Sequence, residues 1–299
     1  MEKVEVFKTH LTSIFGDKTK SILDNLNFKP ITFRINYLVN TAKILQSLAI
    51  QGFVIINGPL SNSYVIESQT KRLSETSEFK NGDIYIQSLA SMLPAIILNP
   101  QSQDAILDLC AAPGSKTSQI ANLTNNSAHI VAVENNSNRF HALKSNLEMQ
   151  KITNVQVILS NGVGFDRDNP QFANYFDKVL VDAPCSNEGI INLSDNNALA
   201  YWNSKTAKKL SKLQKALLAT GLRCLKKGGK LVYSTCTFST EENEEVVAWA
   251  LKKFPEMHLS EIKLPLQNTT SGLLGVSEAL RILPDKYFTG FFVALFEQK

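Results

Sequence analysis

Short apolar runs alternate with longer stretches of helical periodicity over most of the chain after residue 104. Runs rich in valine, isoleucine and leucine are typical of strands buried on both faces, and helices between them favour parallel pairing. The pattern therefore predicts an α/β fold with a doubly wound, mostly parallel, Rossmann-like sheet. The expected strands span residues 105–110, 129–134, 155–159, 178–182, 230–236 and 291–296.

The chain before about residue 75 shows a different pattern. Strand-like runs at 31–39 and 53–56 flank a helical stretch at 41–51. Closely spaced strands beside one helix predict a small α+β N-terminal domain over residues 1–75. The Rossmann-like domain is then expected over residues 76–299.

Composition narrows the class of protein. With 43% hydrophobic and 19% charged residues, the 299-residue chain can bury a full core, which argues against disorder. A net charge of +4 permits a polyanionic partner. The longest apolar stretch, 89–98, is too short to cross a membrane, and residues 1–16 hold no uninterrupted apolar run. We therefore expect neither a membrane partner nor a signal peptide.

The four cysteines are Cys110, Cys185, Cys224 and Cys236. They form no C-x-x-C pair and match no common zinc spacing, so no metal site is expected. Sparse cysteines of this kind are typical of reduced thiols in a cytoplasmic protein, and we expect a monomer there. Cys110 and Cys224 read as core residues.

The first motif runs from Asp108 to Thr117, where a strand passes through a loop of small residues into a helix. Small residues let the backbone approach a ligand, and the helix start offers unpaired amides. Glu134 ends the next strand, where a carboxylate can accept both ribose hydroxyls of a nucleoside cofactor. The alternative is a tight turn packed for geometry alone. The G-x-G-x-x-G pattern is missing, which disfavours a nicotinamide oxidoreductase.

Two further strands each deliver a cysteine to their carboxyl end. One leads into Asp182-Ala183-Pro184-Cys185-Ser186, and the other ends at Ser234-Thr235-Cys236-Thr237. In the usual methyltransferase strand order these strands are neighbours, so the two cysteines would meet at one rim beside the cofactor.

A thiol at that rim suits methylation of carbon 5 of cytosine. A thiolate that adds to ring carbon 6 makes carbon 5 nucleophilic, and a carboxyl beside the base can supply the proton needed at ring nitrogen 3. Asp182 fits as that carboxyl, Lys116 as a positive charge that lowers a thiol pKa, and one cysteine as the nucleophile. Amino-nitrogen methyltransferases carry an Asn/Asp-Pro-Pro-aromatic loop instead, which this chain lacks.

These motifs resemble those of the Sun/RsmB family of RNA (cytosine-5) methyltransferases, relatives of the Nop and Nsun proteins. The similarity runs from about Gly82 onward and touches weakly on residues 32–36. The closing segments Arg281-Ile282-Leu283-Pro284 and 289–294 match the family's last motif.

The resemblance implies roles for individual residues. The cofactor is S-adenosyl-L-methionine, Cys236 is the nucleophile, and Cys185 assists release of the product. DNA methyltransferases use the Pro-Cys cysteine, so Cys185 as nucleophile remains the rival assignment. Asp182 contacts the cytosine and Lys116 supports the site. The residues implied in cofactor binding are Ala112, Pro113, Gly114, Ser115, Lys116, Glu134, Asn161 and Asp182.

The chain departs from the family pattern at four positions. Ser115 stands where a second glycine is common, which makes the turn less permissive. Asn161 replaces an aspartate that contacts adenine, although its amide carbonyl can accept the same hydrogen bond. Asn187 replaces a glycine, and Thr289 replaces an aspartate.

The expected macromolecular partner is RNA, either tRNA or ribosomal RNA. Residues 196–240 hold nine lysines and arginines and no acidic residue, which would attract a polyanion. We favour an amphipathic helix at 206–222 whose lysines face water, and packing roles for Tyr201 and Trp202 over base stacking. A phosphate contact by Arg34 is a further hypothesis.

Two alternatives stay open. One is a methyltransferase of the same fold acting on DNA, protein or a small molecule. The other is a non-catalytic RNA-binding ribosome-assembly factor, which the intact cysteines and cofactor loop disfavour.

Overall fold

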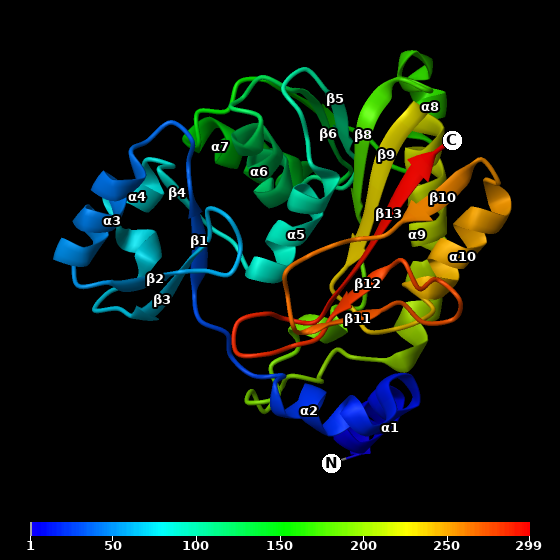
Figure 1. Cartoon of the computed structure of the whole chain (residues 1–299), viewed down its shortest axis with the longest axis horizontal. Helices are drawn as coiled ribbons and strands as arrows, with labels where there is room; N and C mark the ends of the chain where they lie inside the picture. The colour runs from blue at the N-terminus through cyan, green and yellow to red at the C-terminus, as the bar shows by residue number, and fades with distance from the viewer. Residues whose placement is uncertain (1) are drawn as a thin grey trace.

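The main domain is built on one large sheet (Figure 1). The computed structural model describes residues 2–299, and the strands of this sheet there are β5 (Ala105–Asp108), β6 (His129–Glu134), β7 (Val155–Leu159), β8 (Phe176–Asp182), β9 (Leu225–Thr235), β10 (Met257–Ser260), β11 (Thr269–Ser271), β12 (Leu280–Ile282) and β13 (Phe291–Gln298). Their order is β11-β12-β13-β9-β8-β5-β6-β7, with β10 paired to β13. Strands β5 to β9 run parallel, and β13 runs antiparallel to β9. The predicted fold class is confirmed.

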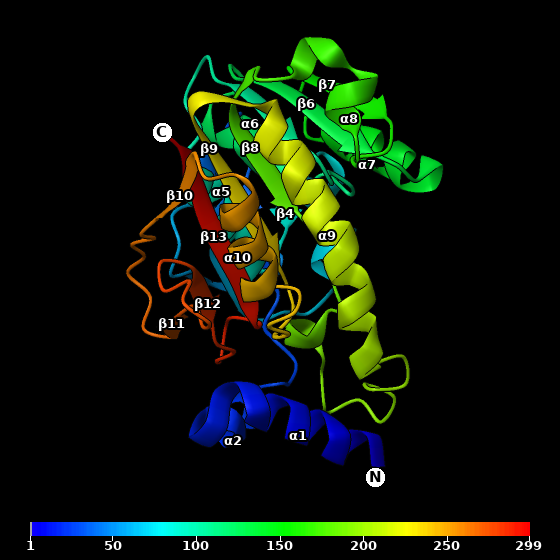
Figure 2. The same cartoon turned by 90° about the vertical axis from the view of Figure 1, so that its right-hand side faces the viewer.

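Helices cover both faces of the large sheet (Figure 2). On one face lie α5 (Leu89–Leu98), α6 (Ser115–Leu123) and α7 (Ser137–Met149), and on the other α8 (Phe165–Asp168), α9 (Ser204–Cys224) and α10 (Glu244–Lys253). Successive strand residues alternate between two apolar cores: Ile106 packs with the first set, and Leu107 with the second. No helix within residues 2–299 combines the length and apolar character that a membrane span requires.

A small antiparallel sheet stands beside the main domain (Figure 1). It consists of β1 (Thr32–Ile35), β2 (Val54–Asn57), β3 (Tyr64–Ser68) and β4 (Ile84–Ile86), in the order β2-β3-β1-β4, with α3 (Thr41–Ile50) and α4 (Ser77–Lys80). The expected α+β character is confirmed. Residue 75 falls before β4, which pairs with β1. We therefore propose that the domains divide between β4 and α5.

The first two helices, α1 (Glu2–Phe15) and α2 (Thr19–Asp24), were not foreseen from the sequence. They lie away from the small sheet and pack against the main domain (Figures 1 and 2). Phe7 and Leu11 of α1 share an apolar cluster with Trp202 and Phe238. The segment before β1 therefore belongs to the main domain by packing, although the small sheet follows it in sequence.

Arg34 of β1 joins the small sheet to the main domain. Its side chain donates hydrogen bonds to Gln87 Oε1 at 2.9 Å, Ser118 Oγ at 2.5 Å and Gln150 Oε1 at 3.2 Å. Only 2% of the residue is exposed. This burial argues against the hypothesis of a phosphate contact by Arg34, because most of its guanidinium is bonded inside the protein.

Candidate active site

Two adjoining cavities open at the carboxyl ends of the parallel strands, where open α/β sheets bind ligands. We call the larger one, of about 410 Å³, the cysteine pocket; it is lined by Ser88, Ser91, Cys110, Ala112, Lys116, Arg139, Asp182, Ala183, Pro184, Cys185, Asn187, Ile190, Cys236, Thr289 and Phe291. The smaller one, of about 50 Å³, is the Glu134 pocket; it is lined by Leu109, Cys110, Val133, Glu134, Asn135, Arg139, Asn161, Gly162, Pro184, Leu213 and Leu217. The cavities share Cys110, Arg139 and Pro184, so they form one continuous site.

The two cysteines meet at this rim. Asp182 of β8 lies in register with Ser234 of β9, so the residues that follow leave the sheet side by side. The Cys185 and Cys236 sulfurs are 3.2 Å apart, and the Cys236 backbone N–H donates to Cys185 Sγ at 3.3 Å. The neighbouring Cys236 sulfur and burial raise the pKa of Cys185 well above its usual range. Cys185 therefore keeps its proton more firmly than an ordinary thiol.

Asn187 contacts both thiols. Its φ is +60°, a left-handed conformation that asparagine tolerates better than most residues. Its Oδ1 accepts from Cys236 Sγ at 3.0 Å and lies 3.6 Å from Cys185 Sγ. Asparagine thus meets the conformational demand that a glycine would meet, and it adds a polar contact to the cysteine pair.

Asp182 and Lys116 form an ion pair beside the cysteines. Lys116 Nζ donates to Asp182 Oδ2 at 2.6 Å and to Ser91 Oγ at 2.9 Å. Ser234 Oγ donates to the other carboxylate oxygen at 2.7 Å. The Asp182 side chain is still 30% exposed toward the pocket. The carboxylate is therefore held in one orientation and remains open to a ligand. The positive charge of Lys116 is paired with Asp182 and not with either thiol.

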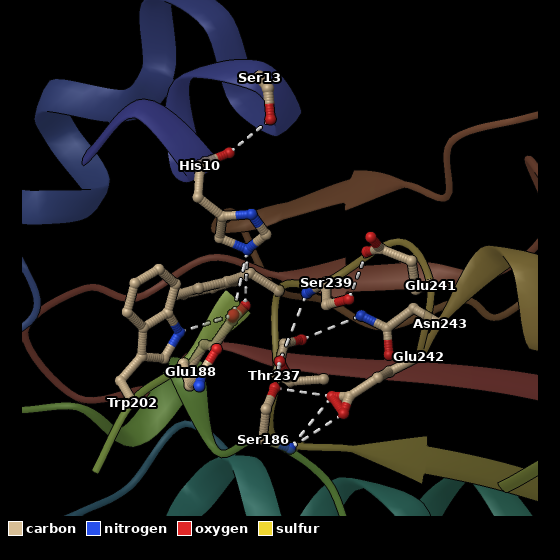
Figure 3. A network of polar contacts seen from close by, with 12 residues as sticks. His10, Ser13, Ser186, Glu188, Trp202, Thr237, Ser239, Glu241, Glu242 and Asn243 are labelled. Carbon is tan, nitrogen blue, oxygen red and sulfur yellow. Dashed lines mark hydrogen bonds and ion pairs between the residues drawn. The ribbon is translucent and has the colours of Figure 1, made fainter. Parts of the chain in front are cut away.

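A buried polar network fixes two loops, one that follows β8 and carries Cys185 and one that follows β9 and carries Cys236 (Figure 3). We call them the cysteine loops. Glu242 accepts from the Ser186 backbone N–H at 3.0 Å and from Ser186 Oγ at 2.7 Å. Ser186 Oγ also lies 2.7 Å from Thr237 Oγ1. Asn243 accepts from Thr235 Oγ1 at 2.6 Å and donates to the Thr237 carbonyl at 3.0 Å. Two consecutive residues before α10 thus fix the loops on either side of the cysteine pair.

Helix α1 reaches the same network through His10 (Figure 3). His10 Nε2 lies 3.1 Å from Glu188 Oε1, which also accepts from Trp202 Nε1 at 3.0 Å. Burial alone would lower the pKa of His10, but the hydrogen bond and charge of Glu188 outweigh it and raise that pKa. Glu188 directly follows Asn187, so this contact anchors the cysteine loop at its far end.

The loop into α6 takes its shape from one glycine. Gly114 has φ +102°, and a Cβ there would lie 2.9 Å from Leu143. Ser115 begins α6 without a positive φ, so the serine in place of a second glycine imposes no strain. Ala112 and Lys116 line the cysteine pocket, whereas Pro113, Gly114 and Ser115 shape the turn without lining either cavity.

Glu134 is buried at the end of β6. Its Oε1 accepts the backbone N–H groups of Asn135 and Asn136 at 3.0 and 2.9 Å, and its Oε2 lies 3.5 Å from Arg139. Asn161 lines the same pocket, with its Oδ1 accepting from the Val163 N–H at 2.9 Å. Glu134 Oε2 and the amide nitrogen of Asn161 are the groups left to face a ligand.

Asp108 and Cys110, two residues of the first motif, differ in their surroundings. Asp108 accepts from Thr117 Oγ1 at 2.6 Å, and burial raises its pKa to about 6. Cys110 packs against the core and also lines both pockets, so the prediction that it is only a core residue is wrong. Cys224 is fully buried as expected.

The structure brings most of the predicted site residues together. Cys185, Cys236, Asp182, Lys116 and Ala112 line the cysteine pocket, and Glu134 and Asn161 line its extension. Arg139, which links the two pockets, was missed because no local pattern marks its position on α7. The described residues hold no group of three His, Cys, Asp or Glu side chains suited to a metal ion.

The sheet topology and the two cavities at the carboxyl ends of its parallel strands are those of a Rossmann-like methyltransferase with a small N-terminal α+β domain. A family model described as "16S rRNA methyltransferase RsmB/F" matches residues 95–297, and the chain belongs to that family. The resemblance read from the motifs is confirmed.

Individual relatives agree with this assignment. Ribosomal RNA small subunit methyltransferase F of Vibrio campbellii is 36% identical over 277 residues, which cover 89% of this chain and 57% of that protein. The tRNA (cytosine(49)-C(5))-methyltransferase of Pyrococcus abyssi is 35% identical over 246 residues, covering 81% of this chain and 77% of that protein. A crystal structure of a methyltransferase homolog from Pyrococcus horikoshii superposes with a TM-score of 0.83 at 30% identity, covering 96% and 93% of the two chains. The chain spans little more than half the length of the Vibrio relative.

Proposed function

We propose that this protein methylates carbon 5 of a cytosine in RNA, using S-adenosylmethionine and a covalent adduct on Cys236. The observation that carries the proposal is the pair of thiols 3.2 Å apart, at the ends of neighbouring parallel strands and beside the Asp182 carboxylate. A thiol pair in this position has no packing role that apolar side chains could not fill.

The site suits an adenosyl cofactor. Leu109 and Leu217 provide apolar walls in the Glu134 pocket, and in the proposal the Glu134 carboxylate accepts hydrogen bonds from the ribose hydroxyls. Asn161 is the residue with an amide left for the adenine edge. Arg139 lies where the pockets join and carries the positive charge that a cofactor carboxylate needs.

In the proposed reaction the chain activates the base. The bound cofactor supplies an electrophilic methyl group for carbon 5. Cys236 Sγ, as the thiolate, adds to carbon 6, and the electron pair of the ring double bond moves to carbon 5. Asp182, in contact with Lys116, holds a proton at ring nitrogen 3 while negative charge develops there.

Release reverses these movements. The carbon 5 proton passes to water in the open cavity, the double bond forms again, and Cys236 leaves as thiolate. The Cys185 S–H donates a hydrogen bond to that leaving sulfur, which stabilises its charge. The 3.2 Å separation of the two sulfurs supports this contact.

For the substrate we propose a flexible region of ribosomal RNA or tRNA, because the names of the relatives divide between these two classes. A cytosine must leave its stack to reach the cysteine pocket, which favours loops and single strands. We further propose a cytoplasmic monomer; the four free thiols are in keeping with a reducing compartment.

The test is covalent trapping on cellular RNA in which cytosine is replaced by 5-azacytosine. We expect wild type and Cys185→Ala to crosslink and Cys236→Ala to lose the crosslink. Sequencing the trapped RNA then identifies the substrate. A crosslink that survives in Cys236→Ala and is lost in Cys185→Ala would assign the nucleophile to Cys185. No crosslink from wild type with cofactor present would refute cytosine-5 methylation.

A further inference from the structure

A third cavity adjoins the cysteine pocket on the side away from the Glu134 pocket. It has a volume of about 420 Å³ and is called the Tyr201 cavity, after the aromatic residue on its wall. It shares Cys185, Asn187 and Ile190 with the cysteine pocket. A polymer with one unit in the cysteine pocket therefore has a continuous path into the Tyr201 cavity.

Tyr201 is the most exposed aromatic residue in the part of the chain that the structure describes. The residue is 100% exposed, whereas the adjacent Trp202 is buried against α1. The expected packing role is thus confirmed for Trp202 and wrong for Tyr201. A fully exposed ring contributes nothing to the core, and a flat aromatic face is the surface on which unstacked bases bind.

A cationic side chain of α9 lies near this cavity. Thr206 of α9 lines the Tyr201 cavity, and Leu213 of the same helix lines the Glu134 pocket. Residues three and four apart share a helix face, so exposed Lys209 lies between these two positions on the flank of α9 nearest the site. Lys208, also exposed, points about 100° further round the helix and away from the site.

Asp195 also lines the cavity, where like charge would repel a phosphate. Its Oδ1 accepts from the Asn197 N–H at 2.8 Å, which leaves the other carboxylate oxygen to accept from a base amino group. The cavity thus offers a stacking face and a hydrogen-bond acceptor for a base, with the cationic side chain at its border.

We propose that the Tyr201 cavity binds the nucleotide next to the target cytosine in a single-stranded RNA. Its base stacks on Tyr201, and Lys209 contacts the phosphate that joins it to the next unit. The proposal rests on the proposed function for the identity of the neighbouring base, but it concerns binding and can be tested separately from methyl transfer.

The experiment measures the dissociation constant of a pool of short single-stranded RNAs, with one central cytosine and random flanks, on the full chain. We expect Tyr201→Ala to raise it about tenfold, since one base–aromatic stack is lost, and Tyr201→Phe to keep it within about twofold. Lys209→Gln should reduce the slope of log affinity against log salt by about one, which corresponds to the loss of one phosphate contact. Lys208→Gln should reduce this slope by clearly less. Because these side chains are exposed, all four variants should keep the wild-type melting temperature.

Methyl transfer to the same RNA separates this proposal from the proposed function. If wild type binds RNA through Tyr201 but transfers no methyl group, the subsite stands and the reaction is wrong. If wild type methylates the RNA while Tyr201→Ala binds it equally well, the reaction stands and the subsite is overturned. Wild type that does not bind the RNA also overturns the subsite, as does equal salt dependence of the two lysine variants.

Discussion

The two joined pockets are built by different means. Around the cysteine pocket, the hydrogen bonds that Glu242, Asn243 and Glu188 make with neighbouring residues fix the loops that carry the thiols. The Glu134 pocket is shaped mainly by apolar walls, such as Leu109 and Leu217, with one buried carboxylate among them. The thiols are thus held by directional contacts, whereas the Glu134 pocket combines apolar walls with a few fixed polar groups.

This difference reflects what each region must do. A misplacement of about 1 Å at reacting atoms lowers a rate steeply, whereas an apolar slot tolerates small shifts with modest loss of affinity. Substitutions behind the cysteine pocket should therefore act on kcat, and substitutions in the Glu134 pocket on KM for the cofactor.

The largest effect is expected at Asp182. Asp182→Asn removes the charge that pairs with Lys116 and the carboxyl proposed to supply the proton to ring nitrogen 3, so kcat should fall about 10²- to 10⁴-fold. Steady-state methylation of RNA measures it. Asp166→Asn is the matched control, because it breaks an ion pair with Arg223 outside both pockets. Equal losses in the two variants would mean that Asp182 acts only through stability.

A smaller effect on kcat is expected at Glu242. In Glu242→Gln one oxygen acceptor becomes an N–H donor facing the N–H and O–H of Ser186, so the cysteine loop should shift. We expect kcat to fall about tenfold with KM for the cofactor unchanged, and the free energy of unfolding to fall by about 1–3 kcal/mol. Glu241→Gln, which loses one contact to Ser239, should leave kcat intact. A pure KM effect in Glu242→Gln would contradict the comparison.

The Glu134 pocket should show the opposite behaviour. Glu134→Gln keeps the size of the side chain but weakens its hydrogen bonds to hydroxyls, so KM for S-adenosylmethionine should rise about tenfold while kcat changes little. Isothermal titration with the cofactor gives the same loss in affinity. Glu148→Gln, on the exposed face of α7, is the control. A drop in kcat alone would show that Glu134 serves the chemistry.

The smallest effect concerns stability and pH. Burial raises the pKa of Asp108 from 3.8 to about 6, so the folded protein binds this proton more tightly than the unfolded chain. The contribution of Asp108 to the free energy of unfolding is therefore largest at low pH and is lost as pH rises between these two values. Urea unfolding across that window should show a shallower decline in Asp108→Asn than in wild type. An identical pH dependence in both would place the titration elsewhere.

Much of the fold could be predicted because its strands are continuous apolar runs. The meeting of Cys185 and Cys236 also followed from sequence, since parallel neighbours end at one edge. The short strands β10 to β12 and the helices α1 and α2 were missed, because their stability comes from distant partners such as Trp202.

The supports of the site were the hardest part to predict. Glu242, Asn243 and Glu244 form a polar run that local rules assign to solvent, yet all three are fully buried. Their partners are Ser186, Thr237 and Arg281, and of these Ser186 and Arg281 lie far away in sequence. The signal that could have marked them is a run of carboxylates a few residues after a strand that leads into a cysteine.

The position of β13 has a consequence for synthesis of the chain. The strand that leads to Cys236 pairs on one side with β8 and on the other with β13, which is translated after every other helix and strand of the structure. Until residues 291–298 emerge from the ribosome, β9 is an open edge with unpaired amides and uncovered apolar side chains. The growing chain therefore carries a surface prone to aggregation beside Cys236 until almost the whole sequence described here has been made.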